Sequence, residues 1–155
     1  MTDSDDIATE IHRQARRLFR DGIAESALVE KSGKVEKPIP IHGADHAIEA
    51  WFVGVVVGDK LAGYMRLQNN LTLLGYSCFQ RRPDSIDECP GADTWLDPNA
   101  VLELARSVTG PNDRLEQPFL GYDKHPSRLA WHVRVSADDG GEKLVLAAGG
   151  HVYLA

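Results

Sequence analysis

The residues best suited to chemistry lie in the segment His42-Gly43-Ala44-Asp45-His46. Imidazoles and a carboxylate are ordinary metal ligands, and the same groups act as general acids and bases in enzymes. The spacing matches no strong metal-binding signature, however, and His and Asp beside Gly are equally typical of a polar loop. We therefore predict no metal site and no catalytic residue from this segment.

The two cysteines, Cys78 and Cys89, are too far apart in sequence for a CxxC redox or zinc motif. One alternative is that they join His42 or His46 in a zinc site, and another is that one of them is a nucleophile with a histidine base. The favoured interpretation is that Cys78 packs as a small hydrophobic residue and Cys89 lies in a loop. No GxSxG, HExxH, Walker or GxGxxG motif occurs, so the sequence leans against an enzyme and predicts no cofactor.

An amphipathic helix is predicted from residue 6 to residue 20. Its apolar residues recur at helical spacing, and a set of arginines lies on the opposite side. These arginines are candidate binding residues for an acidic partner or a phosphate, although a solvated helix face has the same pattern. The arginines are Arg13, Arg16, Arg17 and Arg20.

Alternating and β-branched residues predict strands in both halves of the chain. The first half carries a meander at 50–57, 62–68 and 71–79, and the second half carries strands at 119–122, 129–136, 143–148 and 151–154. Between them, Asp97-Pro98 begins a second helix and Gly110-Pro111 ends it. The last strand is expected at a sheet edge, where it can pair with another chain.

The strand at 50–57 is apolar on both faces. Trp51 and its alternating valines form one face, and Phe52, Gly54 and Val56 form the other. The second face must be covered by the segment 80–96, by the other half of the chain or by a second subunit, and an uncovered patch would be an interaction site. Phe52 and Val56 are therefore candidate binding residues.

Shifting the chain by about 80 residues along itself places Trp51 on Trp131, Val53 on Val133 and Asp59 on Asp139. This match predicts an α+β fold of two tandem α-β-β-β repeats, with the helices packed on antiparallel sheet. The expected units are residues 1–90 and 91–155, forming one compact body. Pairing of their edge strands into one wider sheet is left open.

The second half also resembles a known family. Residues Leu129, Ala130, Trp131, Val133 and Val135 follow the Leu-Ala-Trp-x-Val-x-Val core strand of PepSY-type modules, which occur in thermolysin-class propeptides. The resemblance covers roughly residues 96–155, and the first half shares only Ala50-Trp51 and its valines. It implies a helix-plus-sheet module in the second half.

Composition narrows the function classes. A net charge of -6 argues against nucleic acid as a partner, and the absence of a signal sequence or a long apolar run argues against a membrane and for the cytoplasm. The leading hypothesis is a non-enzymatic protein-binding, assembly or regulatory module of a bacterial cytoplasmic protein, with a protein partner or self-association. The alternative is a small-molecule-binding protein or enzyme with a cleft lined by His42, Asp45, His46 or His132, which requires at least two of these side chains to converge.

Overall fold

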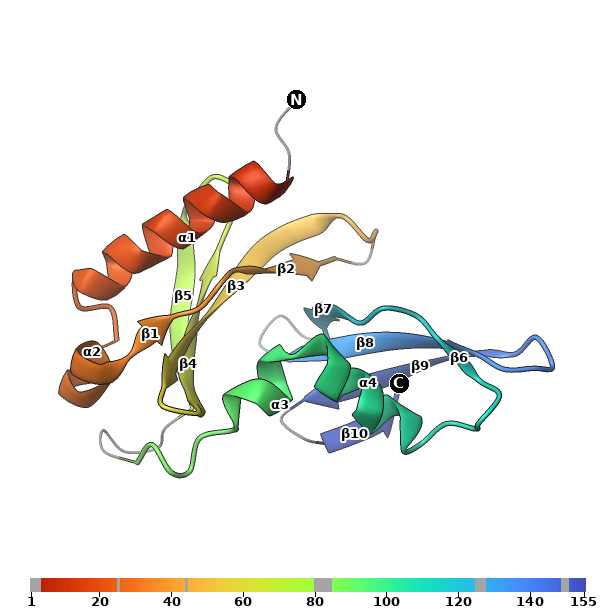
Figure 1. Cartoon of the computed structure of the whole chain (residues 1–155). Helices are drawn as coiled ribbons and strands as arrows, with labels where there is room; N and C mark the ends of the chain where they lie inside the picture. Colours follow the sequence, from red (N-terminus) through yellow and green to blue (C-terminus); the bar gives the residue numbers. More distant parts are fainter. Residues whose placement is uncertain (1–3, 25, 44, 80–84, 125–127, 149–150) are drawn as a thin grey trace.

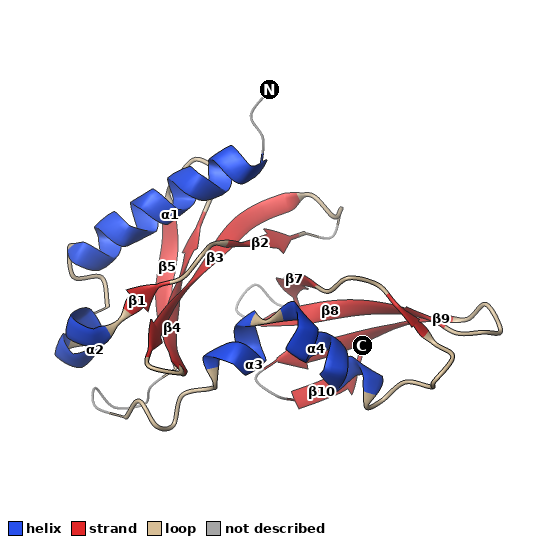
Figure 2. Ribbon diagram, in the orientation of Figure 1, coloured by secondary structure: helices blue, strands red, loops and turns tan. Residues whose placement is uncertain are grey.

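The computed structural model describes residues 4–24, 26–43, 45–79, 85–124, 128–148 and 151–155. Its helices are α1 (Ser4–Arg20), α2 (Ala27–Ser32), α3 (Ala92–Leu96) and α4 (Pro98–Arg106). Its strands are β1 (Lys34–Val35), β2 (Ile39–His42), β3 (Ile48–Val57), β4 (Lys60–Leu67), β5 (Leu73–Cys78), β6 (Arg114–Leu115), β7 (Phe119–Tyr122), β8 (Leu129–Ser136), β9 (Glu142–Ala148) and β10 (His151–Leu154). Figures 1 and 2 show their arrangement.

The described strands form one large mixed sheet, and the predicted fold of two α-β-β-β repeats with helices packed on antiparallel sheet is wrong. The strand order is β10-β9-β8-β7-β2-β3-β4-β5, with β1 added beside β3 and β6 beside β8. The structure is 40% strand and only 26% helix. The 80-residue spacing of the predicted repeat recurs in the structure, since β6 begins eighty residues after β1 and β7 begins eighty residues after β2. The two halves nevertheless share one sheet.

The two halves join through β2 and β7, which pair in parallel with Ile41 opposite Leu120 and His42 opposite Gly121. The other pairs of described strands are antiparallel. The side chains of Ile41 and Leu120 are fully buried, so the junction belongs to the core. We call this parallel pair of strands the seam.

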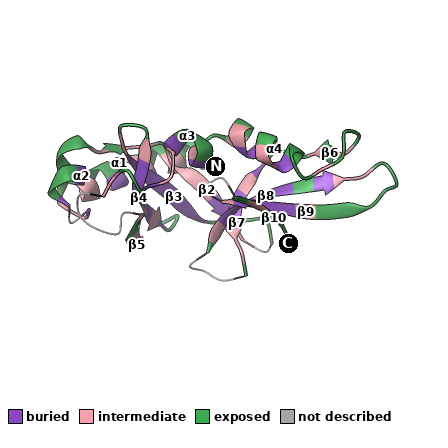
Figure 3. Ribbon diagram, turned by 90° about the horizontal axis from the view of Figure 1, so that it is seen from below, coloured by how far each residue is buried: buried purple, intermediate pink, exposed green. Residues whose placement is uncertain are grey.

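Helices cover opposite faces of the sheet in the two halves. Trp51, Val53 and Val55 of β3 pack with Ile11 and Ala15 of α1. In β8 the alternating residues Trp131, Val133 and Val135 pack in a second cluster with α3 and α4. That second cluster also holds Phe52 and Val56, which project from the face of β3 away from α1. Buried residues concentrate in β3, β4, β8 and β9, whereas the side of α1 turned away from the sheet is exposed (Figure 3).

The short helix α3 covers the second apolar face of β3. The indole of Trp95 stacks on the ring of Phe52, with centroids 5.1 Å apart and planes 6° from parallel. The backbone carbonyl of Trp95 accepts a buried hydrogen bond of 2.7 Å from the indole nitrogen of Trp131. Of the three covers proposed from the sequence, the 80–96 segment therefore supplies this one through its described residues 92–96.

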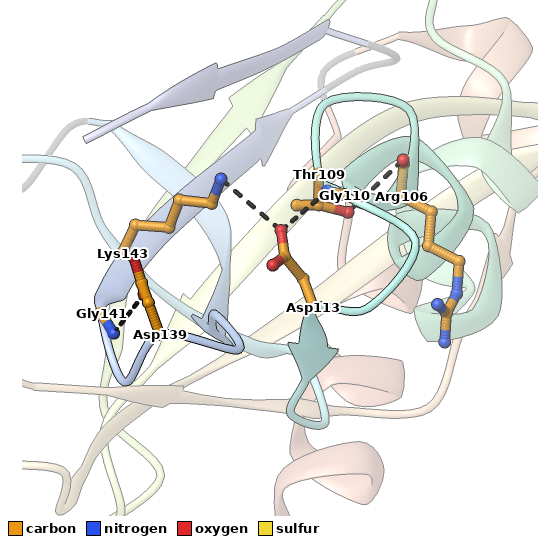
Figure 4. Close-up of polar contacts among 7 residues, drawn as sticks. All are labelled: Arg106, Thr109, Gly110, Asp113, Asp139, Gly141 and Lys143. Carbon is orange, nitrogen blue, oxygen red and sulfur yellow. Dashed lines mark hydrogen bonds and ion pairs between the residues drawn. The ribbon is translucent and has the colours of Figure 1, made fainter.

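The turn after α4 is tied to the β8–β9 hairpin (Figure 4). The Asp113 carboxylate accepts a hydrogen bond of 2.7 Å from the backbone N–H of Gly110 and lies 3.7 Å from the Lys143 ammonium group. Asp97 caps α4 at its other end by accepting from the backbone N–H of Asn99, and Pro98 fits the first helical position. Asp113 thus joins the end of α4 to β9, while Asp97 and Pro98 determine where the helix begins.

Replacing Trp131 by Phe should lower the free energy of unfolding by about 1–3 kcal/mol, because the Trp95 carbonyl loses its donor inside the core. Trp51 offers a matched comparison, since its indole donates to the exposed residue Asn69. The Trp51→Phe change should cost less because water replaces that partner. Chemical denaturation of both variants tests this, and an equal or larger loss for Trp51→Phe would contradict it.

Candidate functional site

The candidate site lies on the sheet face of β7 and β8 that is turned away from α4. His132 and Arg134 alternate with the core residues of β8 and therefore project from this face. Phe119 is directly opposite His132 in the β7–β8 ladder, which places its ring on the same side. His42 joins them because it pairs with Gly121 across the seam.

The Phe119 ring is the centre of the site. The His132 ring stacks on it with centroids 5.0 Å apart and planes 21° from parallel. His42 and His46 approach it edge-on, at centroid distances of 5.7 Å and 6.2 Å. The Arg134 guanidinium carbon lies over the ring at 5.5 Å from its centroid. Three histidines and one arginine thus surround one phenylalanine.

The loop after β2 fixes the orientation of His42. The Nδ1–H group of His42 donates a hydrogen bond of 2.9 Å to the backbone carbonyl of His46. His46 has a φ of 66°, in the left-handed region, and its backbone N–H donates to the carbonyl of Gly43. Because Nδ1 of His42 must be the donor toward a carbonyl, the neutral ring keeps Nε2 as an acceptor.

Arg134 is the main positive charge of the site. Its Nη2 lies 2.8 Å from Nδ1 and 2.7 Å from Nε2 of His46, so its N–H donates to whichever ring nitrogen carries the lone pair. Among the described residues, no carboxylate forms an ion pair with Arg134. A guanidinium held between an imidazole and a phenyl ring without a carboxylate retains donors for an anion.

His132 is the most perturbed group of the site. Burial lowers the pKa of this imidazole from its usual 6.5, so the ring is neutral at neutral pH. Its Nε2 atom is buried, and no described residue meets it with ordinary hydrogen-bond geometry, although the ring is close enough to the backbone of Tyr122 for that contact to raise the pKa in part. Gly121 makes room for this atom, since a Cβ at that position would lie 3.0 Å from it.

A cleft of about 500 Å³ runs along these side chains. Its other lining residues are Gly43, Glu49, Tyr122, Lys124 and Leu144. Lys124 adds a second permanent positive charge, and Glu49 is the single carboxylate among the described lining residues. We call this space the seam cleft.

Three of the four residues that the sequence proposed for a ligand cleft do line the seam cleft. His42, His46 and His132 converge there. Asp45 does not line the cleft. It is exposed, and its carboxylate accepts from the backbone N–H of Ala47.

The arginines of α1 form a separate surface. Arg16 and Arg20 line a hollow of about 660 Å³ beside Lys34 of β1. Arg13 pairs with Glu10 on the same helix, and Arg17 is exposed. All of these arginines remain accessible to a partner, but they take no part in the seam cleft.

Phe52 and Val56 do not provide a binding surface in this fold. They are 0% and 7% exposed, and both belong to the core cluster under α3. The prediction that they bind a partner was wrong because the apolar face they share is covered within the chain.

The cysteines and histidines do not assemble a metal centre among the described residues, in which no group of three His, Cys, Asp or Glu side chains is placed to hold an ion. Cys78 is exposed and Cys89 is buried. Burial, together with the nearby Cys78, raises the pKa of the Cys89 thiol, which favours its protonated and unreactive form.

Comparison with known proteins identifies no relative. No family model matches the chain, and neither the curated proteins nor the solved structures contain a significant match. The resemblance to PepSY-type modules therefore stays a prediction. In the part of the chain that the structure describes, no helix is long and apolar enough to span a bilayer.

Sequence reasoning missed Phe119 and Arg134 as site residues. Arg134 was recognisable only as one polar residue on the wet face of a strand, and Phe119 as an apolar residue at a strand start. The signal that unites them with His132 is cross-strand pairing, which becomes visible once the β7–β8 register is known.

The lowered pKa of His132 predicts a pH-dependent stability. Below about pH 6.5 the unfolded chain binds a proton more readily at this position than the folded chain does, so the free energy of unfolding should fall as the pH falls. His132→Phe retains a stacked ring and should show a smaller fall. Denaturation at several pH values tests this, with His151→Gln, a change of an exposed histidine, as the control. An unchanged slope in His132→Phe would contradict the prediction.

Proposed function

We propose that this chain is a binding protein for a small anionic molecule, which occupies the seam cleft. The observation that carries the proposal is Arg134, a guanidinium that lacks a carboxylate partner among the described residues and is held in place by His46 and Phe119. Guanidinium groups bind carboxylates and phosphates through pairs of parallel hydrogen bonds, and preorganisation reduces the entropy lost on binding.

The remaining side chains support an anion with hydrogen-bonding capacity. Lys124 adds a second cation, and the two outnumber Glu49 among the lining residues. Nε2 of His42, left as an acceptor by the hydrogen bond at Nδ1, suits a hydroxyl or a protonated oxygen of the ligand. Phe119 and Leu144 give the cleft an apolar floor. A small organic acid or phosphate ester combines these features.

The volume of the cleft agrees with a small ligand. About 500 Å³ lies within the range of ordinary small-molecule sites. The elements that shape the cleft are strands of a continuous sheet together with one short hydrogen-bonded loop, so the arrangement of His42, Phe119 and His132 is set by the backbone ladder.

The protein-binding or assembly hypothesis stays a second proposal, but the candidate binding surface is smaller than the sequence predicted. Because Phe52 and Val56 are buried, it now depends on the arginine face of α1 and on the edge strand β10. Leu154 of β10 is 60% exposed, which favours the edge for pairing with another chain. Sedimentation of the wild type at several concentrations tests self-association, and a concentration-independent monomer would argue against it.

The anion proposal predicts that succinate or inorganic phosphate binds at the seam cleft while neutral succinamide does not. Arg134→Gln should weaken binding by about tenfold or more, since a hydrogen bond to a charged group contributes about 1.5–3 kcal/mol. Arg106→Gln is the matched control, because Arg106 is an exposed arginine at the end of α4 (Figure 4). Titration calorimetry and chemical-shift mapping measure both variants.

Two results would contradict this proposal. One is equal binding of succinate and succinamide, which would show that charge is not recognised. The other is an unchanged affinity in Arg134→Gln. Circular dichroism of Arg134→Gln verifies the fold, and Arg134 is exposed, so its loss leaves no cavity in the core.

A further inference from the structure

A second pocket lies where α3 meets strands of both halves, and Asp123, which lines it, directly follows Tyr122 of the seam cleft. The second pocket has a volume of about 620 Å³. Tyr64, Phe79 and Trp95 line it from the first half and from α3, and Asp123, Arg128 and Tyr153 line it from the second half. We call it the aromatic pocket.

One wall of the aromatic pocket is a continuous set of rings. Phe79 lies 5.6 Å from Tyr64 and 6.2 Å from Trp95 between ring centroids. Behind them, Phe52 stacks on both Tyr64 and Trp95. The buried hydrogen bond from Trp131 to the Trp95 carbonyl fixes the helix that carries this wall. The rings are therefore already in place before any ligand binds.

The opposite side carries one charge of each sign. Asp123 and Arg128 close the β7–β8 connection, with the Asp123 backbone N–H donating 2.8 Å to the Arg128 carbonyl. Among the described residues no ion pair joins their side chains, and they are the charged residues that line this pocket. Two opposite charges thus face one cavity without neutralising each other.

Tyr153 links the rings to the carboxylate. Its hydroxyl donates a hydrogen bond of 2.7 Å to Asp123. Burial and this hydrogen bond raise the pKa of Tyr153 to about 12, so the hydroxyl remains a donor at neutral pH. The ring of Tyr153 is thereby held in the pocket lining beside the carboxylate.

We propose that the aromatic pocket binds a zwitterion that carries an alkylated ammonium group and a carboxylate. The partly exposed rings of Tyr64 and Phe79, together with Asp123, attract the cation, and Arg128 attracts the carboxylate. Among the described lining residues there is one charge of each sign, which favours a ligand with no net charge. The rings offer few hydrogen-bond acceptors, so a methylated ammonium, which is weakly hydrated, loses less on entry than a primary one.

Three ligands of nearly equal shape test the charges separately. Glycine betaine carries both charges, choline carries the cation alone, and 3,3-dimethylbutanoate carries the anion alone on a neutral carbon analogue of the ammonium. Chemical-shift titration followed at the Trp95 indole and the Tyr153 amide restricts the measurement to this pocket. We expect betaine to bind about tenfold tighter than either of the other two, because choline loses the charged hydrogen bond to Arg128 and 3,3-dimethylbutanoate loses the cation–π contact.

Single-charge variants then assign each half of the ligand. Asp123→Asn should weaken betaine and choline but not 3,3-dimethylbutanoate, whereas Arg128→Gln should weaken betaine and 3,3-dimethylbutanoate but not choline. Asp138→Asn, at an exposed turn position between β8 and β9, is the matched control and should change none of them. Each variant is also titrated with succinate, so that loss of the seam cleft is recognised separately.

The proposal is overturned if choline or 3,3-dimethylbutanoate binds as tightly as betaine in the wild type. It is also overturned if none of the three shifts the Trp95 or Tyr153 signals at millimolar concentration. Because the comparison of ligands uses the unaltered chain, a variant that fails to fold does not affect this test.

Discussion

The parallel pairing of β2 with β7 is the constraint on which the rest of the structure depends. Without it, β2 and β7 would each be the exposed edge of a small antiparallel sheet, with unpaired backbone groups facing water. The pairing buries Ile41 and Leu120 completely and continues the hydrogen-bond ladder from β10 to β5. It also sets His42 beside Gly121, and hence beside Phe119 and His132, so the same contact that joins the halves creates the seam cleft.

The position of the helices explains why the two halves use their second faces differently. α1 covers one face of β3, and α3 covers the other by placing Trp95 on Phe52. In the second half, α4 covers the face of β8 that holds Trp131, but the opposite face carries His132 under the small ring of Phe119. An apolar residue such as Phe52 requires a cover, whereas the exposed side chain of Arg134 on this second face does not. The first half therefore has a closed core, whereas the second has an open cleft.

Local pattern in the sequence located most elements and failed where distant strands had to be paired. Amphipathic spacing gave α1, and alternation gave β3, β7, β8 and β10 closely. β2 was missed because Pro38 and Pro40 interrupt its pattern, and the union of the halves depends on β2. Non-local pairing leaves no periodic signal, so the three histidines could be singled out by residue type while their common neighbours, Phe119 and Arg134, could not. Phe52 and Val56 were named as binding residues because the sequence could not decide which of three possible covers lies over them, and the structure shows that it is α3.

The unpartnered nitrogen of His132 argues that the seam cleft serves more than stability. A buried polar atom without a hydrogen bond costs about 1–3 kcal/mol, and a phenylalanine stacked on Phe119 would avoid that cost. Gly121 adds to it, because glycine in a strand is less favourable than a residue with a side chain, yet any Cβ there would crowd His132. His132 and Gly121 are thus two residues that lower stability, and they are in contact at Nε2 of His132, close to Arg134. Local conflicts of this kind are expected where a protein retains groups for a ligand.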